Sequence, residues 1–451
     1  MQTISAKELD SSRPKYLVIF DDATVKNTNT LSTVLKRGKA EGVAKREGIS
    51  MLAAGESGVN TKVYESLGVA AADLSKSQHD TLTKRSDVIA IVENEVRYLP
   101  PVRKTMEETD RKSASNDNPP IIAYLEGLRD AANMALAYQQ GSKPISVSSL
   151  AARPTMDIAA VPRATWGLKA IGVSTALNPP TGKGVKVAVL DTGIDLKHPD
   201  FRNKVVEGVT AVSMLKKANI SVQDVNGHGT HCAGIICGPR QSISGIRYGV
   251  ASDVGLLVGK VFNNNIRPTA TDDRILDGIT WAEQNGARII SMSLGSLRMV
   301  GGEFPLAYET IVKKLLTRKT NGVLIIAAAG NDSERPMSTA PVGNPASCPS
   351  IMAVAAVDRN NNIADFSCRQ MDDIGVVDVS APGVAVFSSF LNGTFEKLDG
   401  TSMATPFVAG LAALYLEREP KLTAQKLFDE LKKRARQLGV AEDFGAGIVK
   451  L

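Results

Sequence analysis

A serine at the head of an apolar run is a candidate nucleophile in this 451-residue chain. Ser402 lies in the segment GTSMATPFVAG, where Gly400 permits a tight turn and helps to keep the hydroxyl uncovered. The apolar residues that follow predict a buried helix, whose first N–H groups and partial positive charge would face an oxyanion formed at this serine. Because a serine hydroxyl is a weak nucleophile alone, the chemistry also needs a base and an orienting carboxylate.

The base is predicted to be His228, one of four histidines in the chain. Glycines on both sides leave space around its imidazole, and the following residues, Ala233, Ile235 and Ile236, predict a helix that packs into a core. Less specific settings surround the other three histidines. We interpret the one at 231 and the one at 198 as structural, and the one at 79 as solvated.

The orienting carboxylate is predicted to be Asp191, which directly follows a β-branched run at 185–190. Such a run is typical of a buried parallel strand, and functional groups in open α/β sheets gather at the carboxyl ends of strands. An aspartate there can hold the imidazole in one tautomer and stabilise the imidazolium. Asp195 and Asp200 are better explained as turn residues.

Three motifs in the order Asp191, His228, Ser402 resemble the signatures of the subtilisin-like serine peptidases. They are VAVLDTGID at 187–195, HGTHCAG at 228–234, which is especially similar to the proteinase K branch, and GTSMATP at 400–406. The resemblance implies an endopeptidase that works through an acyl-enzyme and needs no cofactor for its chemistry. Ser402 would attack, His228 would move the proton, and Asp191 would orient His228.

The same resemblance assigns an oxyanion donor and a substrate cleft. Asn331, which follows an apolar run, matches the family asparagine that donates its side-chain amide to the oxyanion. Ser293, Leu294 and Gly295 match the segment that pairs with an extended substrate. Gly343 matches the back wall of the first specificity pocket.

The preference of that pocket has two readings. Glycine at position 343 leaves room for a large side chain, which favours an apolar or aromatic residue before the scissile bond. Asp332 and Glu334 nearby would instead favour a basic residue. We expect the apolar preference.

Alternating strand-like and helix-like runs from Trp166 onward predict an α/β fold with a doubly wound, mostly parallel sheet over residues 161–451. The expected strands are 185–190, 254–262, 287–294, 322–329 and 351–357, and the expected crossover helices are 271–285 and 305–320. Residues 101–160 are expected to be a connector with one amphipathic helix at 121–136.

Residues 1–100 have a different pattern. Strands are expected at 15–20, at 63–73 with a bend, and at 88–98, and helices at 30–47 and 74–85, an order that is ferredoxin-like and leaves room for a further strand at the bend. This small α+β domain is similar to the inhibitory propeptides of subtilisin-like enzymes. It predicts a self-inhibited zymogen that processes itself between Leu99 and Trp166, with an unrelated adaptor domain as the alternative.

Composition excludes several other classes. The net charge of +6 and the pI near 9.0 are modest, and no basic patch with interleaved aromatics predicts nucleic-acid binding. No apolar run reaches the length of a membrane span. Four cysteines are too few for a disulfide framework and lack zinc spacing. The sequence starts without a secretory signal, which favours a cytoplasmic location over secretion.

Calcium is not expected at the usual family loop. Asp200 matches one ligand position, but the loop at 238–244 lacks the asparagine-rich run and carries Arg240, whose charge opposes a divalent cation. Structural calcium elsewhere stays open.

Two other functions fit the same residues. In an acyl transferase, such as a peptide ligase or macrocyclase, an amine would replace water at the acyl-enzyme. In an inactive binding module, the N-terminal domain would stay bound, but such a module has no need of an intact triad and oxyanion donor.

Overall fold

A computed structural model describes residues 13–21, 32, 33, 35, 49–52, 61–65, 67–100, 103–104, 163–176, 178–202, 206–210 and 221–451. Residues 1–104 and 163–451 belong to one compact unit. The predicted connector helix at 121–136 and nearly all of the predicted helix at 30–47 lie outside the described residues. In the ranges given above, no helix has the length and apolar character needed to cross a membrane.

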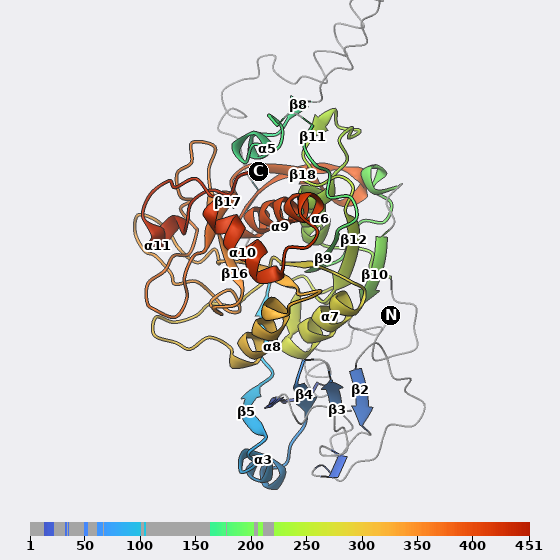
Figure 1. Ribbon diagram of the computed structural model, residues 1–451, viewed down its shortest axis with the longest axis vertical. Helices are drawn as coiled ribbons and strands as arrows, with labels where there is room; N and C mark the ends of the chain where they lie inside the picture. Colours follow the sequence, from blue (N-terminus) through green and yellow to red (C-terminus); the bar gives the residue numbers. More distant parts are fainter. Residues whose placement is uncertain are drawn as a thin grey trace, which may run out of the picture. The chain divides into compact units, whose positions relative to one another are not determined.

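Seven strands form the central sheet, in the order β10-β12-β9-β14-β15-β16-β17, and every neighbouring pair is parallel (Figure 1). This confirms the α/β class and the mostly parallel sheet. The strands are β9 (Lys186–Asp191), β10 (Val206–Thr210), β12 (Gly255–Lys260), β14 (Ile289–Met292), β15 (Leu324–Ala328), β16 (Met352–Val357) and β17 (Val379–Pro382).

Helices cover both faces of this sheet, as the doubly wound pattern predicts (Figure 1). In β9, Val187 and Val189 belong to the core shared with α6 and α9, whereas Ala188 and Leu190 belong to the core shared with α7 and α8. This alternation follows from the two-residue period of a strand. The helices are α5 (Trp166–Ala170), α6 (His228–Cys237), α7 (Asp272–Gln284), α8 (Leu306–Thr317), α9 (Thr401–Arg418), α10 (Ala424–Lys433) and α11 (Ala441–Phe444).

Short strands make three smaller sheets around this core. One joins β8 (Arg163–Ala164) to β11 (Ile246–Arg247), one joins β6 (Val96–Tyr98) to β13 (Thr269–Thr271), and one has the order β18-β19-β7, with β18 (Val386–Ser389), β19 (Phe395–Asp399) and β7 (Arg103–Lys104). The sheets with β6 and β7 join N-terminal residues to residues 269–271 and 386–399.

The N-terminal sheet has five strands in the order β2-β3-β4-β1-β5, all antiparallel. They are β1 (Tyr16–Phe20), β2 (Ile49–Leu52), β3 (Thr61–Tyr64), β4 (Val69–Ala72) and β5 (Val88–Glu93), with α3 (Lys76–Thr83) between β4 and β5. The bent strand predicted at 63–73 is two strands, β3 and β4, whose turn includes Gly68 at a φ of 79°. β2 was not expected from the sequence. The ferredoxin-like class of this domain stays a prediction.

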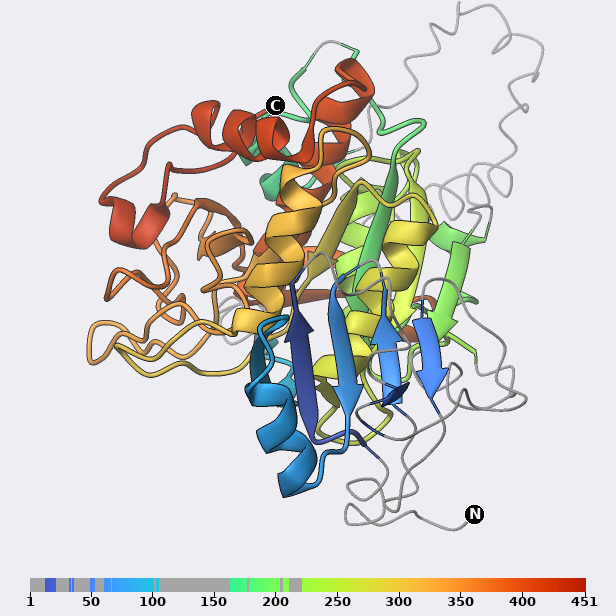
Figure 2. The same ribbon diagram turned by 60° about the horizontal axis from the view of Figure 1, so that its bottom comes forward.

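The predicted last strand at 88–98 is wrong as a single strand. It ends at Glu93, and β6 leaves the N-terminal sheet to pair with β13. Asn94 marks the break: its side-chain nitrogen donates to Asp273 on α7 at 2.9 Å. Figure 2 shows the N-terminal sheet in front of α7 and α8, and apolar residues of the sheet and of both helices share one buried cluster.

Candidate active site

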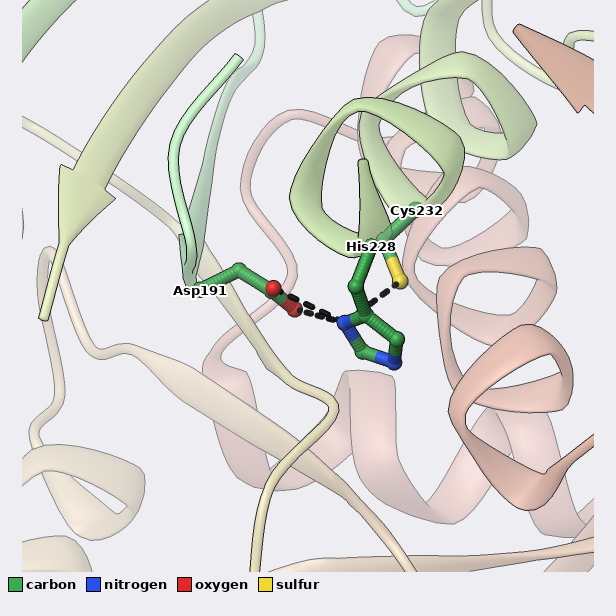
Figure 3. A group of neighbouring side chains, drawn as sticks. All are labelled: Asp191, His228 and Cys232. Atoms are coloured by element: carbon green, nitrogen blue, oxygen red, sulfur yellow. Dashed lines mark hydrogen bonds and ion pairs between the residues drawn. The ribbon is translucent and has the colours of Figure 1, made fainter. Parts of the chain in front are cut away.

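Asp191 and His228 face each other from two neighbouring elements (Figure 3). Asp191 is the last residue of β9, and His228 is the first residue of α6. His228 Nδ1 lies 2.8 Å from Asp191 Oδ1 and 3.0 Å from Oδ2, and both side chains are buried. Gly227, at a φ of 100°, lets the chain turn directly into the helix at the histidine.

Two residues that the sequence analysis did not single out fix this geometry. Asp224 accepts hydrogen bonds from the backbone N–H of Asn226 and of Thr230, which holds the loop before His228 against the first turn of α6. Thr192 accepts a hydrogen bond from the backbone N–H of Gly229 at 2.9 Å through its hydroxyl. Asp224 lies in a loop without a strand-end or motif signal, so only the folded structure reveals its contacts.

The carboxylate beside His228 makes the imidazole a stronger base. Burial alone lowers the pKa of His228, but the charge of Asp191 outweighs burial and holds that pKa well above its usual range. Cys232 lies one turn along α6, with Sγ 3.9 Å from His228 Nδ1 (Figure 3). Burial raises the pKa of the Cys232 thiol, so this group behaves as a small neutral side chain next to the base.

Ser402 is buried at the second residue of α9. Its backbone carbonyl accepts a hydrogen bond from Ser293 Oγ at 2.8 Å and a weaker one from Cys232 Sγ at 3.5 Å. Neither Ser402 Oγ nor His228 Nε2 has a hydrogen-bond partner among the described residues. A catalytic hydrogen bond is often loose without substrate, so this arrangement is compatible with transfer of a proton between the two groups.

Asn331 follows β15 and faces the start of α9. Its Oδ1 accepts hydrogen bonds from Thr401 N at 2.9 Å and from Thr401 Oγ1 at 2.7 Å. A Cβ atom at Gly400 would lie 3.2 Å from Asn331 Nδ2, so the amide nitrogen is beside the turn that leads to Ser402. Thr401 therefore orients Asn331.

The other described histidines have structural contacts. His231 Nε2 lies 3.1 Å from the carbonyl oxygens of Val386 and Glu396, and burial lowers the pKa of His231 to about 3. His198 Nε2 lies 3.0 Å from the carbonyl oxygen of Thr394. Their environments agree with the structural interpretation, and the side chain of His79 is 38% exposed.

The predicted substrate segment adjoins an N-terminal strand. The backbone N–H of Tyr98 donates to the carbonyl of Gly295 at 2.9 Å, and the N–H of Gly295 donates to the carbonyl of Tyr98 at 3.1 Å. Ser296 pairs in turn with Asn344. Gly343 lies beside this pair, and a Cβ atom on it would meet the carbonyl oxygen of Ser296 at 2.7 Å.

The carboxylate of Asp200 is surrounded by hydrogen-bond donors. Its oxygens accept from Ser242 Oγ at 2.6 Å, from Tyr248 OH at 2.7 Å and from the backbone N–H of Ile243 at 3.0 Å. Such donors take the lone pairs that a calcium ligand would offer to the ion. The residues around Asp200 therefore do not fit a calcium site.

The one group of possible metal ligands among the described residues is Asp191, His228 and Cys232. In this group, His228 Nδ1 is already engaged with the Asp191 carboxylate, and Cys232 is a buried thiol whose pKa is raised by burial. Both features favour an acid–base pair over metal binding.

Comparison with known proteins agrees with this geometry. A model described as the subtilase family matches residues 182–447. The chain belongs to the subtilase family. Subtilisin DY of Bacillus licheniformis is 39% identical to it over 270 residues, which cover 60% of this chain and 90% of that protein. Subtilisin Savinase of Lederbergia lenta is 36% identical over 285 residues, covering 63% and 96%.

The match to subtilisin E of Bacillus subtilis (strain 168) is longer. It has 34% identity over 372 residues and covers 82% of this subtilase and 85% of subtilisin E. Residues 161–451 alone are too few for that length, so the match extends into the preceding residues. This subtilase is a serine endopeptidase of the subtilisin-like class, and polypeptides are its substrates.

Proposed function

We propose that this subtilase hydrolyses peptide bonds through an acyl-enzyme formed on Ser402 and is made as a zymogen held inactive by its own N-terminal domain. The observation that carries the catalytic part is the 2.8 Å contact between His228 Nδ1 and Asp191 Oδ1. It leaves Nε2 as the imidazole nitrogen that takes up the proton of the serine hydroxyl.

In the first half of the reaction, Ser402 Oγ bonds to the carbonyl carbon of the substrate while its proton passes to His228 Nε2. Asp191 holds Nδ1–H and stabilises the imidazolium. The oxyanion accepts hydrogen bonds from Asn331 Nδ2 and from the backbone N–H of Ser402, at the start of α9. The C–N bond then breaks, and the imidazolium gives its proton to the leaving amine.

In the second half, water attacks the acyl carbon and His228 takes a proton from that water. Collapse of the second oxyanion breaks the bond to Ser402 Oγ, and His228 returns the proton to the serine. None of these steps requires a cofactor. Acyl transfer to an amine uses the same groups, but no contact among the described residues favours an amine over water.

Inhibition is supported by the contact between β6 and the cleft. β6 pairs with β13 on one side, and its last residue, Tyr98, exchanges two backbone hydrogen bonds with Gly295 on the other. An inserted strand of this kind is a common form of peptide recognition. It occupies the backbone groups that a polypeptide substrate would use.

A buried charge network supports stable docking of the N-terminal domain. Lys62 of β3 lies 2.7 Å from a carboxylate oxygen of Asp273 and 2.7 Å from one of Asp277, both on α7, and Tyr64 OH donates to Asp277 at 2.8 Å. Burial lowers the pKa of Lys62, but the two carboxylates outweigh burial and raise it above its usual value. The ammonium group therefore stays charged and balances the negative charge of the Asp273 and Asp277 carboxylates.

A second contact of this network adjoins the cleft itself. The Arg97 guanidinium binds Asp272 through Nε at 2.7 Å and Nη2 at 2.9 Å, and its Nη1 donates to Ser296 Oγ at 2.7 Å. Paired hydrogen bonds of this kind fix position as well as charge. Arg97 thus supports the register of β6 beside Gly295.

The test compares Ser402→Ala with Ser338→Ala, a change at an exposed serine, in the full-length chain. We expect the wild type and Ser338→Ala to bind a fluorophosphonate probe and to cleave a peptide reporter once the N-terminal domain is removed, whereas Ser402→Ala does neither. Probe labelling or reporter cleavage by purified Ser402→Ala would contradict the assigned nucleophile.

A further inference from the structure

We propose that Tyr98, Leu99 and Pro100 enter the catalytic centre in register with the enzyme and that Pro100 makes this segment a cleavage-resistant inhibitor, so that maturation cuts the chain at another position. This inference rests on the proposed function, because it concerns what the same active site does to its own N-terminal segment. It specifies which residue protects the inhibitor from the enzyme.

On the N-terminal side of the centre, the register is fixed by main-chain hydrogen bonds. Tyr98 and Gly295 form an antiparallel pair that exchanges both bonds. In an antiparallel ladder such pairs recur every second residue, so residue 100 comes opposite Ser293. Ser293 Oγ binds the backbone carbonyl of Ser402 at 2.8 Å, which brings this position to the nucleophile.

On the other side of the centre, the chain is held by a second ladder. The backbone of β7 pairs with β19, with Arg103 opposite Asp399 and Lys104 opposite Leu398. Asp399 precedes Ser402 by only three positions in the sequence. The N-terminal segment is therefore paired with the enzyme on both sides of the nucleophile.

Leu99 and Pro100 lie close to the side chain of His228, the proposed general base. Together with His228, Asn226 and Phe390, they line one hollow of the surface. With residue 100 opposite Ser293, the register brings the peptide bond that follows Pro100 to Ser402. The sequence there is Leu-Pro-Pro-Val, so the bond after Pro100 joins two prolines.

Proline disrupts the productive geometry at this position. Residue 100 should donate its N–H to the carbonyl of Ser293 to continue the ladder, but proline has no N–H. The bond to Pro101 is a tertiary amide, and the ring carbon on its nitrogen restricts the backbone of the preceding residue. The pairing at Tyr98 and at β7 thus gives affinity, whereas the prolines prevent alignment of the bond for attack.

A double variant of the full-length chain, Pro100→Ala/Pro101→Ala, tests the inference. The matched control is Pro179→Ala/Pro180→Ala, another Pro-Pro pair, whose first carbonyl contacts Arg240. Each purified chain is incubated with and without the Ser402→Ala change, and the products are analysed by intact mass and N-terminal sequencing. Thermal unfolding in the Ser402→Ala background checks folding, and single Pro100→Ala gives a second measurement if the double variant is unstable.

We expect the alanine pair to raise the cleavage rate at the 100–101 bond by about 100-fold, because alignment errors near 1 Å have effects of this size. The wild type and the control should keep that bond intact. Cleavage of the wild type there at the rate of the double variant would overturn the inference and leave the proposed function intact.

An intact bond in a folded alanine variant that cleaves an added peptide reporter would also overturn the inference. If the chain freed of its N-terminal domain neither cleaves the reporter nor binds the fluorophosphonate probe, the proposed function fails, and the inference fails with it.

Discussion

Thr401 binds the Asn331 side chain twice: its backbone N–H and its hydroxyl donate to the same oxygen, Oδ1, at 2.9 and 2.7 Å. Because both donors bind the oxygen, the amide nitrogen faces away from Thr401 and lies beside Gly400. The residue directly before Ser402 thus determines which end of Asn331 would meet an oxyanion. Orientation of a preformed dipole of this kind can account for much of the catalytic rate.

Thr401→Val should therefore lower kcat about tenfold with little change in KM, since it removes one hydrogen bond of about 1–1.5 kcal/mol and keeps the side-chain shape. Thr401→Ser restores the hydroxyl and should recover most of the rate. Asn331→Leu should cost about 10²–10³ in kcat, the magnitude known for the equivalent donor in a subtilisin. Steady-state kinetics on the chain freed of its N-terminal domain would measure all three; an unchanged kcat in Thr401→Val would contradict the orienting role.

Asp191→Asn should change both the rate and its pH dependence. The enzyme needs neutral His228, so kcat/KM falls as the pH drops through the pKa of that imidazole, which Asp191 holds well above its usual range. Removing the carboxylate lowers this pKa, so the acid limb should move to lower pH while kcat falls by about 10⁴. Asp195→Asn is the matched control, because Asp195 bonds Lys197 N and Gln223 Nε2 instead of the imidazole. An acid limb at the same pH in Asp191→Asn and the wild type would contradict this assignment.

Lys62→Met should release the N-terminal domain. It leaves the Asp273 and Asp277 carboxylates buried together without their cation, and breaking a buried pair in this way costs about 3–5 kcal/mol. We expect faster appearance of peptidase activity and faster hydrogen exchange in β3. Arg85→Ala, which breaks the partly exposed pair with Asp87, should have little effect because such pairs contribute about 0–1 kcal/mol. Equal activation rates in both variants would argue against docking through Lys62.

Chelators should leave the region of Asp200 unaffected. Its carboxylate is satisfied by Ser242, Tyr248 and Ile243, so we expect EDTA to leave unfolding of this region unchanged. Tyr248→Phe removes a hydrogen bond to a charged group and should lower stability by about 1.5–3 kcal/mol. Calorimetry with and without calcium would measure both effects. Rescue of Tyr248→Phe by calcium would show that an ion can occupy this position after all.

The parts of this protein that short motifs encode could be predicted from the sequence. Asp191 ends a buried strand and Asn331 follows another, while His228 and Ser402 lie in the first turns of two helices, so local pattern was enough to place them. Parallel strands bring such ends to one edge of the sheet. The main strands of the catalytic region were predictable for the same reason.

Features that depend on tertiary pairing were not predictable. β6 continues the apolar pattern of β5, yet Asn94 and Arg97 bind aspartates of α7, which diverts the chain from its own sheet into the cleft. β17 is a short strand with a proline, and its pairing with β16 decides its structure. Lys62 looked like an ordinary strand residue, because its two acidic partners are over 200 positions away in sequence.

The pairing of β6 and β7 with the enzyme also has a kinetic consequence. If β6 and β7 inhibit as proposed, their effective concentration at the cleft is fixed by their place in the same chain and not by the protein concentration. Dilution does not change that concentration, and a competing substrate must exceed it to enter. The onset of activity should therefore be first-order in the intact chain until some chains have been cut, after which released enzyme can accelerate the process.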